Sequence, residues 1–92
     1  MDFYVITYDI PENRPRTKLA NLLEDYGKRV QYSVFEIWLT ATQMRELYRK
    51  IDALLAEEPG QVRFYRLCAD CQKTVDIIGG DDLPEPPGVV II

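Results

Sequence analysis

The sequence contains no histidine and only two cysteines, Cys68 and Cys71, in the spacing C-x-x-C. Without histidine, the chain cannot form a Ser-His-Asp triad, a Cys-His dyad or a histidine-ligated zinc site. A single C-x-x-C pair has too few thiolates for a closed zinc site unless a symmetric partner supplies the others. A thioredoxin-type redox pair begins a helix after a strand, whereas the residues that follow Cys71 predict a further strand. We therefore expect two reduced cysteines at the end of a strand.

Long apolar runs and an excess of positive charge are absent as well. No stretch approaches the roughly 18 to 20 apolar residues of a membrane-spanning helix, and the first residues lack the basic and apolar regions of a signal peptide. We therefore expect a cytoplasmic protein without a membrane partner. The net charge of -4 argues mildly against a nucleic-acid partner.

Basic residues are nevertheless concentrated around one predicted helix. Arg14, Arg16 and Lys18 lie where a strand leads into this helix, and Lys28 and Arg29 lie just beyond its far end. A local basic surface can attract a polyanion even when the total charge is negative. The alternative interpretation is a solvated helix whose charges form weak surface ion pairs.

Length and composition predict one small globular domain. The chain has 92 residues, of which 47% are hydrophobic and 28% are charged, and it is too short for an enzyme with two folded lobes around a cleft. A domain of this size buries a modest core, so self-association would add stability. We expect residues 1–92 to form a single domain whose core lies within residues 1–80.

Four segments have the composition of β-strands. Residues 2–9 are rich in aromatic and β-branched side chains and predict a buried strand that ends at Asp9. Residues 29–39 have the same character and predict either one long strand or a hairpin. Shorter apolar runs predict further strands over residues 62–68 and 75–78.

Two amphipathic helices separate these strands. The first begins at Pro15 and ends at Gly27, and the second begins after a cap at Thr40 or Thr42. Each helix has a single apolar stripe, which predicts an α+β sandwich with both helices on one face of an antiparallel sheet. If residues 29–39 form a hairpin, the order of elements is βαββαβ, the ferredoxin-like arrangement. The strands are apolar on both faces, so the uncovered face indicates a symmetric dimer.

The C-terminal segment, residues 81–92, differs from the rest of the chain. Three prolines within residues 84–87 enforce an extended connector, and the chain finishes with apolar residues from Gly88 to Ile92. An apolar end of this kind needs a docking surface. It could add a strand to the sheet of its own subunit or to that of a second subunit.

Asp9 is the candidate metal ligand, because it ends the first strand next to the basic start of a helix. Mg²⁺ prefers hard oxygen donors and commonly uses only one or two protein carboxylates. Bound there, it would polarise a phosphodiester and lower the pKa of a coordinated water, which supplies a nucleophile without histidine. In a dimer, two copies of Asp9 near the axis could share one ion. Alternatively, Asp9 only caps the turn before Ile10 and Pro11.

Five further residues are candidates for nucleic-acid contact. Tyr8 and Phe35 could stack on bases, although aromatic side chains in the strands of a small sandwich more often belong to the core. Arg14, Arg16 and Arg29 could contact phosphates, since a guanidinium group donates paired hydrogen bonds to phosphate oxygens. Surface ion pairs with acidic neighbours are the alternative for these arginines.

Several segments together closely resemble the CRISPR-associated protein 2 family. They run from Val5 to Ile10, from Arg14 to Leu19, from Tyr26 to Glu36 and from Val62 to Tyr65. The combination of a Tyr-Asp-Ile strand end with Gln-x-Ser-Val-Phe-Glu at this separation is specific. The resemblance covers roughly residues 1–80.

The resemblance implies a ferredoxin-like fold with a hairpin at residues 29–39. It implies a homodimer formed through the open sheet faces, with C-terminal segments that cross to the partner. It also implies that Asp9 is catalytic and ligates Mg²⁺ for cleavage of phosphodiesters in single-stranded RNA or double-stranded DNA. Four residues fall at positions that the family links to activity or nucleic-acid contact: Tyr8, Arg16, Arg29 and Phe35.

The same resemblance implies a second role, in spacer acquisition. There the family's dimer bridges dimers of the CRISPR-associated protein 1 integrase and holds the DNA to be inserted, so the protein need not cut anything. Asp9 favours the nuclease, whereas Arg14, Arg16, Lys18, Arg29 and the C-terminal segment favour the adaptor. Lys18 stands where some relatives have arginine, and lysine cannot form a bidentate pair. We expect a nuclease, with the non-catalytic adaptor as the alternative.

Overall fold

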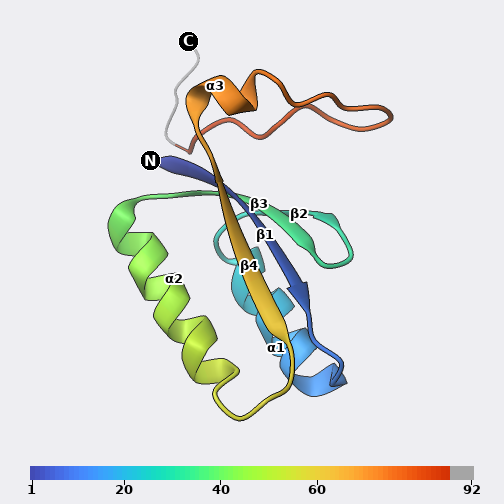
Figure 1. The fold of residues 1–92 in the computed structure, drawn as a ribbon, viewed down its shortest axis with the longest axis vertical. Coiled ribbons are helices and arrows are strands. Elements are labelled where there is room, and N and C mark those ends of the chain that lie inside the picture. The colour runs from blue at the N-terminus through green and yellow to red at the C-terminus, as the bar shows by residue number, and fades with distance from the viewer. Residues whose placement is uncertain (88–92) are drawn as a thin grey trace.

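The computed structural model describes residues 1–87 and contains a four-stranded antiparallel sheet with two long helices on one of its faces (Figure 1). In chain order, the elements are β1 (Asp2–Asp9), α1 (Asn13–Glu24), β2 (Lys28–Gln31), β3 (Val34–Leu39), α2 (Ala41–Leu54), β4 (Gln61–Leu67) and α3 (Ala69–Gln72). The strand order is β2-β3-β1-β4, so β1 lies between β3 and β4. This arrangement confirms the α+β, ferredoxin-like βαββαβ fold predicted from the sequence.

The hydrophobic core lies between the sheet and the two long helices. Leu19 and Leu23 of α1 and Leu47 of α2 are fully buried against apolar side chains of β1 and β3. The start of α2 is fixed by a capping box, in which Thr40 Oγ1 accepts a hydrogen bond from the Gln43 N–H and Gln43 Oε1 accepts one from the Thr40 N–H. Both helices therefore follow the apolar stripes predicted from the sequence.

Residues 29–39 form a hairpin, which resolves the alternative left open by the sequence. Arg29 of β2 pairs with Phe35 of β3 in an antiparallel ladder that contains an irregularity between residues 29 and 31. The turn is tied to the central strand, because the Tyr8 N–H donates a hydrogen bond to the Ser33 carbonyl oxygen at 3.2 Å. The hairpin thereby provides the second and third strands of the ferredoxin-like order.

Gly27 lies where the chain leaves α1 and enters β2. A Cβ at this position would lie 2.5 Å from Cγ1 of Ile37 and 2.8 Å from the carbonyl oxygen of Glu36. Glycine therefore allows the chain to approach β3 closely. The helix itself ends earlier than predicted, at Glu24, and its end tightens, because the N–H groups of Asp25 and Tyr26 bond to the carbonyl oxygens of Leu22 and Leu23, three residues back.

The strand predicted over residues 75–78 is not formed. Instead, β4 ends at Leu67 and leads into α3, whose N-cap is Cys68. The C-x-x-C pair therefore does begin a helix directly after a strand, which corrects the expectation from the sequence. Ile78 is fully exposed. The apolar composition of this run favours a strand, but the run lines a pocket beside the edge strand β2 without pairing with it, and a strand needs a backbone ladder as well as apolar side chains.

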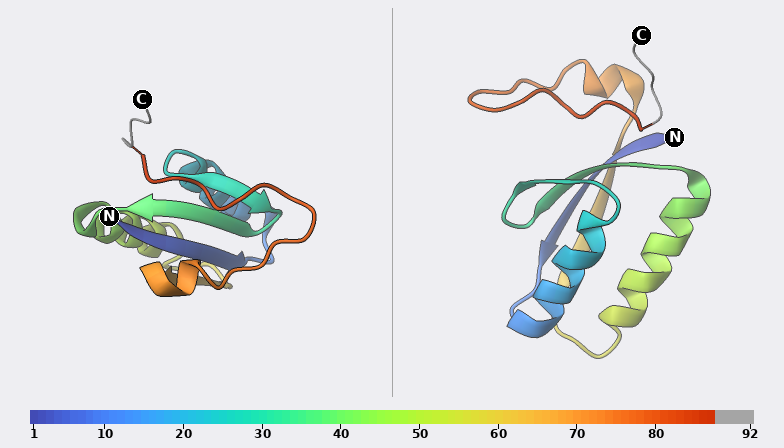
Figure 2. Two further views of the ribbon diagram at one scale, coloured as in Figure 1. Left: turned by 90° about the horizontal axis from the view of Figure 1, so that it is seen from above. Right: turned by 180° about the vertical axis from the view of Figure 1, so that it is seen from behind.

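Residues 73–87 return toward the sheet without forming a strand (Figure 2). Two contacts hold this segment: the Lys28 ammonium lies 3.3 Å from the Asp81 carboxylate, and Trp38 Nε1 donates a hydrogen bond of 2.7 Å to the Pro84 carbonyl oxygen. The predicted C-terminal strand, Gly88 to Ile92, lies outside the described residues. Its docking on a partner stays a prediction.

The face of the sheet opposite the helices is called the open face here. At one end of it, Phe3 is only 1% exposed beside Trp38, with ring centroids 5.1 Å apart. Elsewhere it carries half-buried and exposed side chains from three strands: Val5, Thr7, Asp9, Val34, Glu36, Gln61, Arg63 and Tyr65. Within residues 1–87, no helix combines the length and the apolar character needed to cross a membrane.

Candidate functional site

Asp9 is the last residue of β1 and lies exposed on the open face, cross-strand from Gln61 of β4. It lines a shallow pocket together with Pro11, Gly60 and Gln61. Gly60 has a φ of +130°, and a Cβ there would lie 2.7 Å from the Asp9 carbonyl oxygen. The backbone leading into β4 therefore packs directly on the backbone of Asp9. This contact fixes the position of the main chain from which the Asp9 carboxylate extends.

Arg63 and Tyr65 of β4 extend the site along the open face. Arg63 donates hydrogen bonds to Gln61 Oε1 and to Tyr65 Oη, both at 3.2 Å. The bond to Tyr65 raises the pKa of the Arg63 guanidinium above its ordinary value. A fixed positive charge thus lies on the same face as the Asp9 carboxylate, where it can contact a phosphate.

The donor chemistry of Asp9 fits Mg²⁺, but one chain supplies little of the coordination. Within residues 1–87, no group of three or more histidine, cysteine, aspartate or glutamate side chains could hold a metal ion. A lone exposed carboxylate fits an ion that keeps most of its waters and takes one or two protein carboxylates. A second copy that presents its own Asp9 would supply the other carboxylate.

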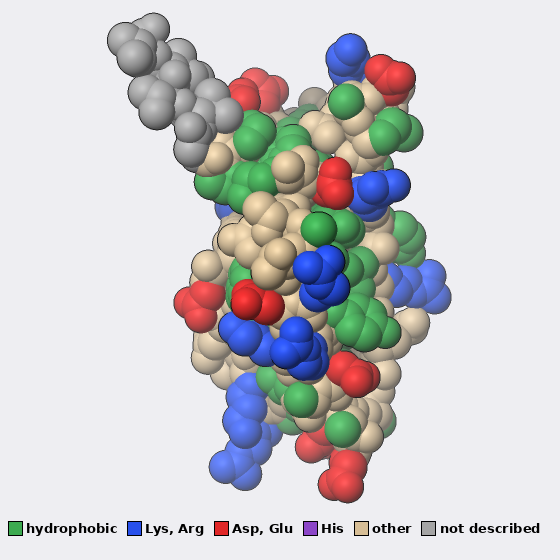
Figure 3. All heavy atoms as spheres, turned by 90° about the vertical axis from the view of Figure 1, so that its left-hand side faces the viewer, with side chains coloured by type: hydrophobic (Ala, Val, Ile, Leu, Met, Phe, Trp, Pro, Cys, Tyr) green, Lys and Arg blue, Asp and Glu red, His purple; other side chains and the backbone are tan. Residues whose placement is uncertain are grey.

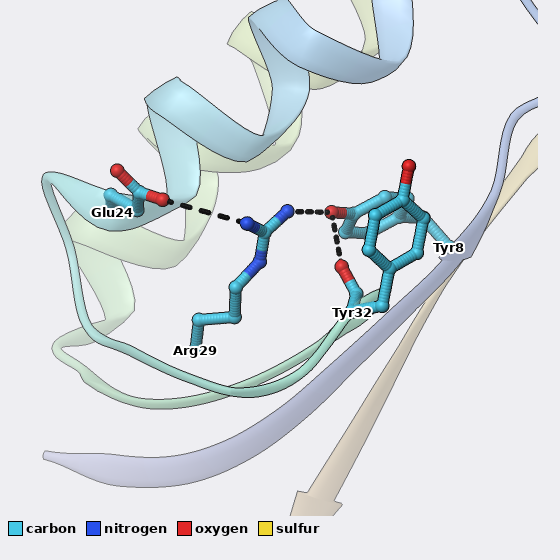
Figure 4. Close-up of polar contacts among 4 residues, drawn as sticks. All are labelled: Tyr8, Glu24, Arg29 and Tyr32. Carbon is cyan, nitrogen blue, oxygen red and sulfur yellow. Dashed lines mark hydrogen bonds and ion pairs between the residues drawn. The ribbon is translucent and has the colours of Figure 1, made fainter. Parts of the chain in front are cut away.

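On the helix side of the sheet, Tyr8 and Arg29 form a polar cluster with Tyr32 and Glu24 (Figure 4). The Tyr8 hydroxyl donates to the Tyr32 carbonyl oxygen at 3.1 Å and accepts from Nη2 of Arg29 at 3.1 Å. Nη1 of Arg29 lies 3.9 Å from the Glu24 carboxylate. The hydrogen bond to Tyr8 raises the pKa of the Arg29 guanidinium. These contacts orient the exposed guanidinium of Arg29 on the β2–β3 hairpin.

Of the two roles that the sequence allowed for Tyr8 and Phe35, stacking on bases or packing in the core, the burial of both rings favours the core. Phe35 is fully buried and Tyr8 is only 5% exposed, so neither ring presents a face to a base. Both rings pack in the core beneath Arg29, whose guanidinium carbon lies 5.5 Å from the centroid of Phe35 and 5.6 Å from that of Tyr32. Their contribution to a site on Arg29 is therefore one of positioning.

The basic residues of α1 divide into two groups. Arg16 is occupied by the chain itself, because its guanidinium donates to the carbonyl oxygens of Ile10 and Pro11 and to Oδ1 of Asn13. It thereby holds the loop that follows Asp9. Arg14 and Lys18 are exposed one turn apart and form no ion pair or side-chain hydrogen bond with the described residues. They are the cations of α1 that a phosphate can approach.

The face of the molecule formed by α2 has a different charge pattern. Figure 3 views the molecule from that side and shows basic and acidic side chains mixed over the helix. A mixed surface produces little net attraction for a polyanion. The cations Arg14 and Lys18 of α1, which form no ion pair with the described residues, are therefore the better candidates for nucleic-acid contact.

Comparison with known proteins decides the family. Residues 1–75 match the family model described as CRISPR associated protein Cas2. The chain belongs to the Cas2 family. It is 47% identical to the CRISPR-associated endoribonuclease Cas2 3 of Synechocystis sp. over 92 residues, with 100% of both chains covered. It is 46% identical to the CRISPR-associated endoribonuclease Cas2 1 of Chloroflexus aurantiacus over 84 residues, with 90% of each covered.

A solved structure supports the same assignment. The Cas2 fold of this chain superposes with a TM-score of 0.80 on a chain of a partial Cas6-RT-Cas1–Cas2 complex, at 35% identity and with 100% of both chains covered. The match extends over the sheet and the helices that position Asp9. Asp9 therefore lies on a fold shared with that Cas2 chain.

Sequence reasoning about this Cas2-family chain missed Arg63 and Tyr65 as site residues. Both were placed in a strand and in a segment that carries the family resemblance, but neither was assigned a role. The strand register places Gln61 opposite Asp9, Arg63 opposite Thr7 and Tyr65 opposite Val5, so all of these side chains share the open face. Gln61, Arg63 and Tyr65 recur at every second position of β4, and this period of two was a usable signal. Linking it to Asp9 required knowing that β1 pairs with β4.

Proposed function

We propose that this Cas2-family chain is a small metal-dependent endonuclease that hydrolyses phosphodiesters of single-stranded RNA, with Asp9 as its metal ligand. The observation that carries the proposal is the exposed Asp9 carboxylate, held at the end of the central strand by Gly60. The names of the two relatives above, both endoribonucleases, support RNA as the substrate class. Double-stranded DNA is the second substrate class to be tested.

The proposed active form is a homodimer that packs the open faces together. Val5, Val34 and Tyr65 give this face apolar surface that the helices of the same chain do not cover. Covering it with a second copy removes apolar area from water and is the simplest self-complementary solution. Such a dimer places two Asp9 carboxylates in one groove. Their repulsion is relieved when a cation lies between them.

Each chain's own residues would perform separate tasks in this groove. Asp9 would hold Mg²⁺. When bound, the ion would polarise the phosphate and make a coordinated water more acidic. Arg63 would contact a non-bridging phosphate oxygen through its guanidinium group. Arg14 and Lys18 would hold flanking phosphates of the bound strand. This division assigns cleavage to the open face and strand binding to α1.

A second candidate function is that of an adaptor with Cas1. The superposition on a chain of the partial Cas6-RT-Cas1–Cas2 complex supports Cas1 as a partner, and the adaptor role would rest on that partnership. In this role the dimer would hold DNA beside an integrase, and Asp9 would have no catalytic task. The free cations Arg14 and Lys18 serve either role. The cytoplasm is our predicted compartment for both.

A cleavage assay distinguishes these functions. Single-stranded RNA and double-stranded DNA are incubated with the parent protein and Asp9→Asn, with Mg²⁺ or with a chelator, and Asp52→Asn on the exposed face of α2 is the matched control. We expect Mg²⁺-dependent cleavage by the parent and the control and none by Asp9→Asn, while nucleic-acid binding persists in all three. Equal cleavage by Asp9→Asn would refute the metal role. Binding without cleavage by the parent would favour the adaptor.

A further inference from the structure

Cys68 and Cys71 lie at the turn after β4, outside the site at Asp9. Both thiols are free and exposed. Cys68 precedes α3 and Cys71 lies within it, and the Cys71 N–H donates a hydrogen bond to Cys68 Sγ at 3.3 Å. The Gln72 N–H closes the same turn on the Cys68 carbonyl oxygen at 2.9 Å. The fold thus holds two accessible thiols side by side.

The geometry of this turn suits an internal disulfide. Cys68 is the N-cap of α3 and Cys71 is the third residue of that helix, and the Cys71 N–H donates a hydrogen bond to Cys68 Sγ at 3.3 Å. The sulfur of Cys68 therefore already lies beside the backbone from which the Cys71 side chain extends. The backbone of the turn is already closed by its own hydrogen bonds. Side-chain rotation is therefore the main movement that bond formation requires.

A closed metal site is the competing use of a C-x-x-C pair, and the surroundings do not support it. Across residues 1–87, no histidine, cysteine, aspartate or glutamate side chain completes a group of three with this pair. The nearby Asp70 carboxylate instead lies 3.9 Å from the Lys73 ammonium. Two thiolates leave a zinc ion open to water. The pair is better suited to dithiol chemistry.

The two thiols are not equivalent. Contact with the Cys71 thiol and the Cys71 backbone N–H lowers the pKa of the Cys68 thiol, and the positive charge of Arg66 acts in the same direction. The same contact raises the pKa of the Cys71 thiol. The thiolate is the nucleophile in disulfide exchange. Cys68 is therefore the attacking residue and Cys71 the resolving one.

We propose that Cys68 and Cys71 form a reversible redox site that closes to an intramolecular disulfide by exchange with a low-molecular-weight disulfide. The Cys68 thiolate attacks one sulfur of the small disulfide, so that a bond to Cys68 forms and one small thiolate leaves. Cys71 then loses its proton to solvent and attacks the Cys68 sulfur, which releases the second small thiolate. The protein gives up two electrons and two protons, and the small disulfide is reduced to two thiols.

Oxidised glutathione serves as the probe for the full-length chain. After acid quenching and mass spectrometry, we expect the parent to lose both free thiols and to retain no glutathione. Cys71→Ser should retain one glutathione on Cys68, because no resolving thiol remains. Cys68→Ser should react several-fold more slowly at neutral pH, and Arg66→Gln should slow the parent reaction while the turn stays intact.

Unfolding the parent in urea is the matched control, because it keeps the sequence and removes the turn. We expect the difference in reactivity between Cys68 and Cys71 to disappear there, whereas it persists in the folded chain. Stable glutathione adducts on both cysteines of the folded parent would overturn the proposal, as would cross-links between copies in place of the internal bond. Tight zinc binding by two copies that protects all thiols would overturn it as well.

Discussion

Replacing Gly60 by alanine tests whether the backbone contact with Asp9 positions the site. Gly60 has a φ of +130°, where residues with a Cβ are strained, and the new methyl group would lie 2.7 Å from the Asp9 carbonyl oxygen and 3.0 Å from Ile10 Cδ1. Strain of this kind costs about 1 to 3 kcal/mol. We therefore expect a loss of about 2 kcal/mol in the free energy of unfolding, or roughly 8 to 16 °C in Tm for a domain of this size.

Two other glycines provide matched controls for the same substitution. Gly79 has a φ of +71° but open space around its Cβ position, so Gly79→Ala carries backbone strain alone, about 1 to 2 kcal/mol. A Cβ at Gly80 would make an ordinary contact of 3.6 Å with Ile77, so Gly80→Ala should change stability by no more than about 0.5 kcal/mol. Urea unfolding followed by the fluorescence of Trp38, the single tryptophan, measures all three.

The functional half of this prediction is measured separately. At a temperature where Gly60→Ala remains folded, we expect it to bind RNA like the parent and to cleave it more slowly, because relief of the contact moves the backbone of Asp9. Gly80→Ala should cleave at the parent rate. The reasoning fails if Gly60→Ala is no less stable than Gly79→Ala and also cleaves like the parent, since the contact with Asp9 would then have no consequence.

Three further changes test the other parts of the site. Tyr8→Phe removes the hydroxyl that joins Arg29 to the Tyr32 carbonyl oxygen, and urea unfolding should show a loss of about 0.5 to 1.5 kcal/mol; unchanged stability would show that the cluster is not coupled to the fold. Arg14→Ala combined with Lys18→Ala should weaken binding of single-stranded RNA and reduce its salt slope by about 1.4; an unaltered slope would exclude phosphate contacts at α1. Tyr65→Glu should lower self-association in sedimentation experiments, whereas a dimer of undiminished affinity would place the interface elsewhere.

The fold was largely predictable because its strongest signals are periodic. The apolar stripe of α1 predicts only an amphipathic helix, and the β-branched run of β1 predicts only a buried strand. Leu19, Leu23 and Ile6 are fully buried, as these patterns predict. The run from Val75 to Ile78 has the same apolar character and does not form a strand. A strand requires a partner, and partners are set by the whole topology rather than by the local sequence.

The site was harder to predict, because alternation is uninformative when a strand is apolar on both faces. Tyr8 and Asp9 are neighbours in the sequence, and both were candidate functional residues, Asp9 for a metal ion and Tyr8 for nucleic acid. The strand places them on opposite faces, so Tyr8 enters the core while Asp9 reaches the open face. Arg63 and Asp9 are the opposite case, because they are far apart in the sequence. Cross-strand register alone brings them to the same face, so the local sequence does not connect them.

This division between faces makes the two proposed roles of the Cas2-family chain separable by mutation. The nuclease depends on the open face, where Asp9 and Arg63 lie, whereas the free cations Arg14 and Lys18 lie on α1, which packs against the other face. Loss of the Asp9 carboxylate leaves those cations in place, and loss of the cations leaves the carboxylate in place. A chain that integrates DNA with Cas1 normally as Asp9→Asn but fails without Arg14 and Lys18 would therefore be acting as an adaptor. The opposite pattern would require the carboxylate itself to take part.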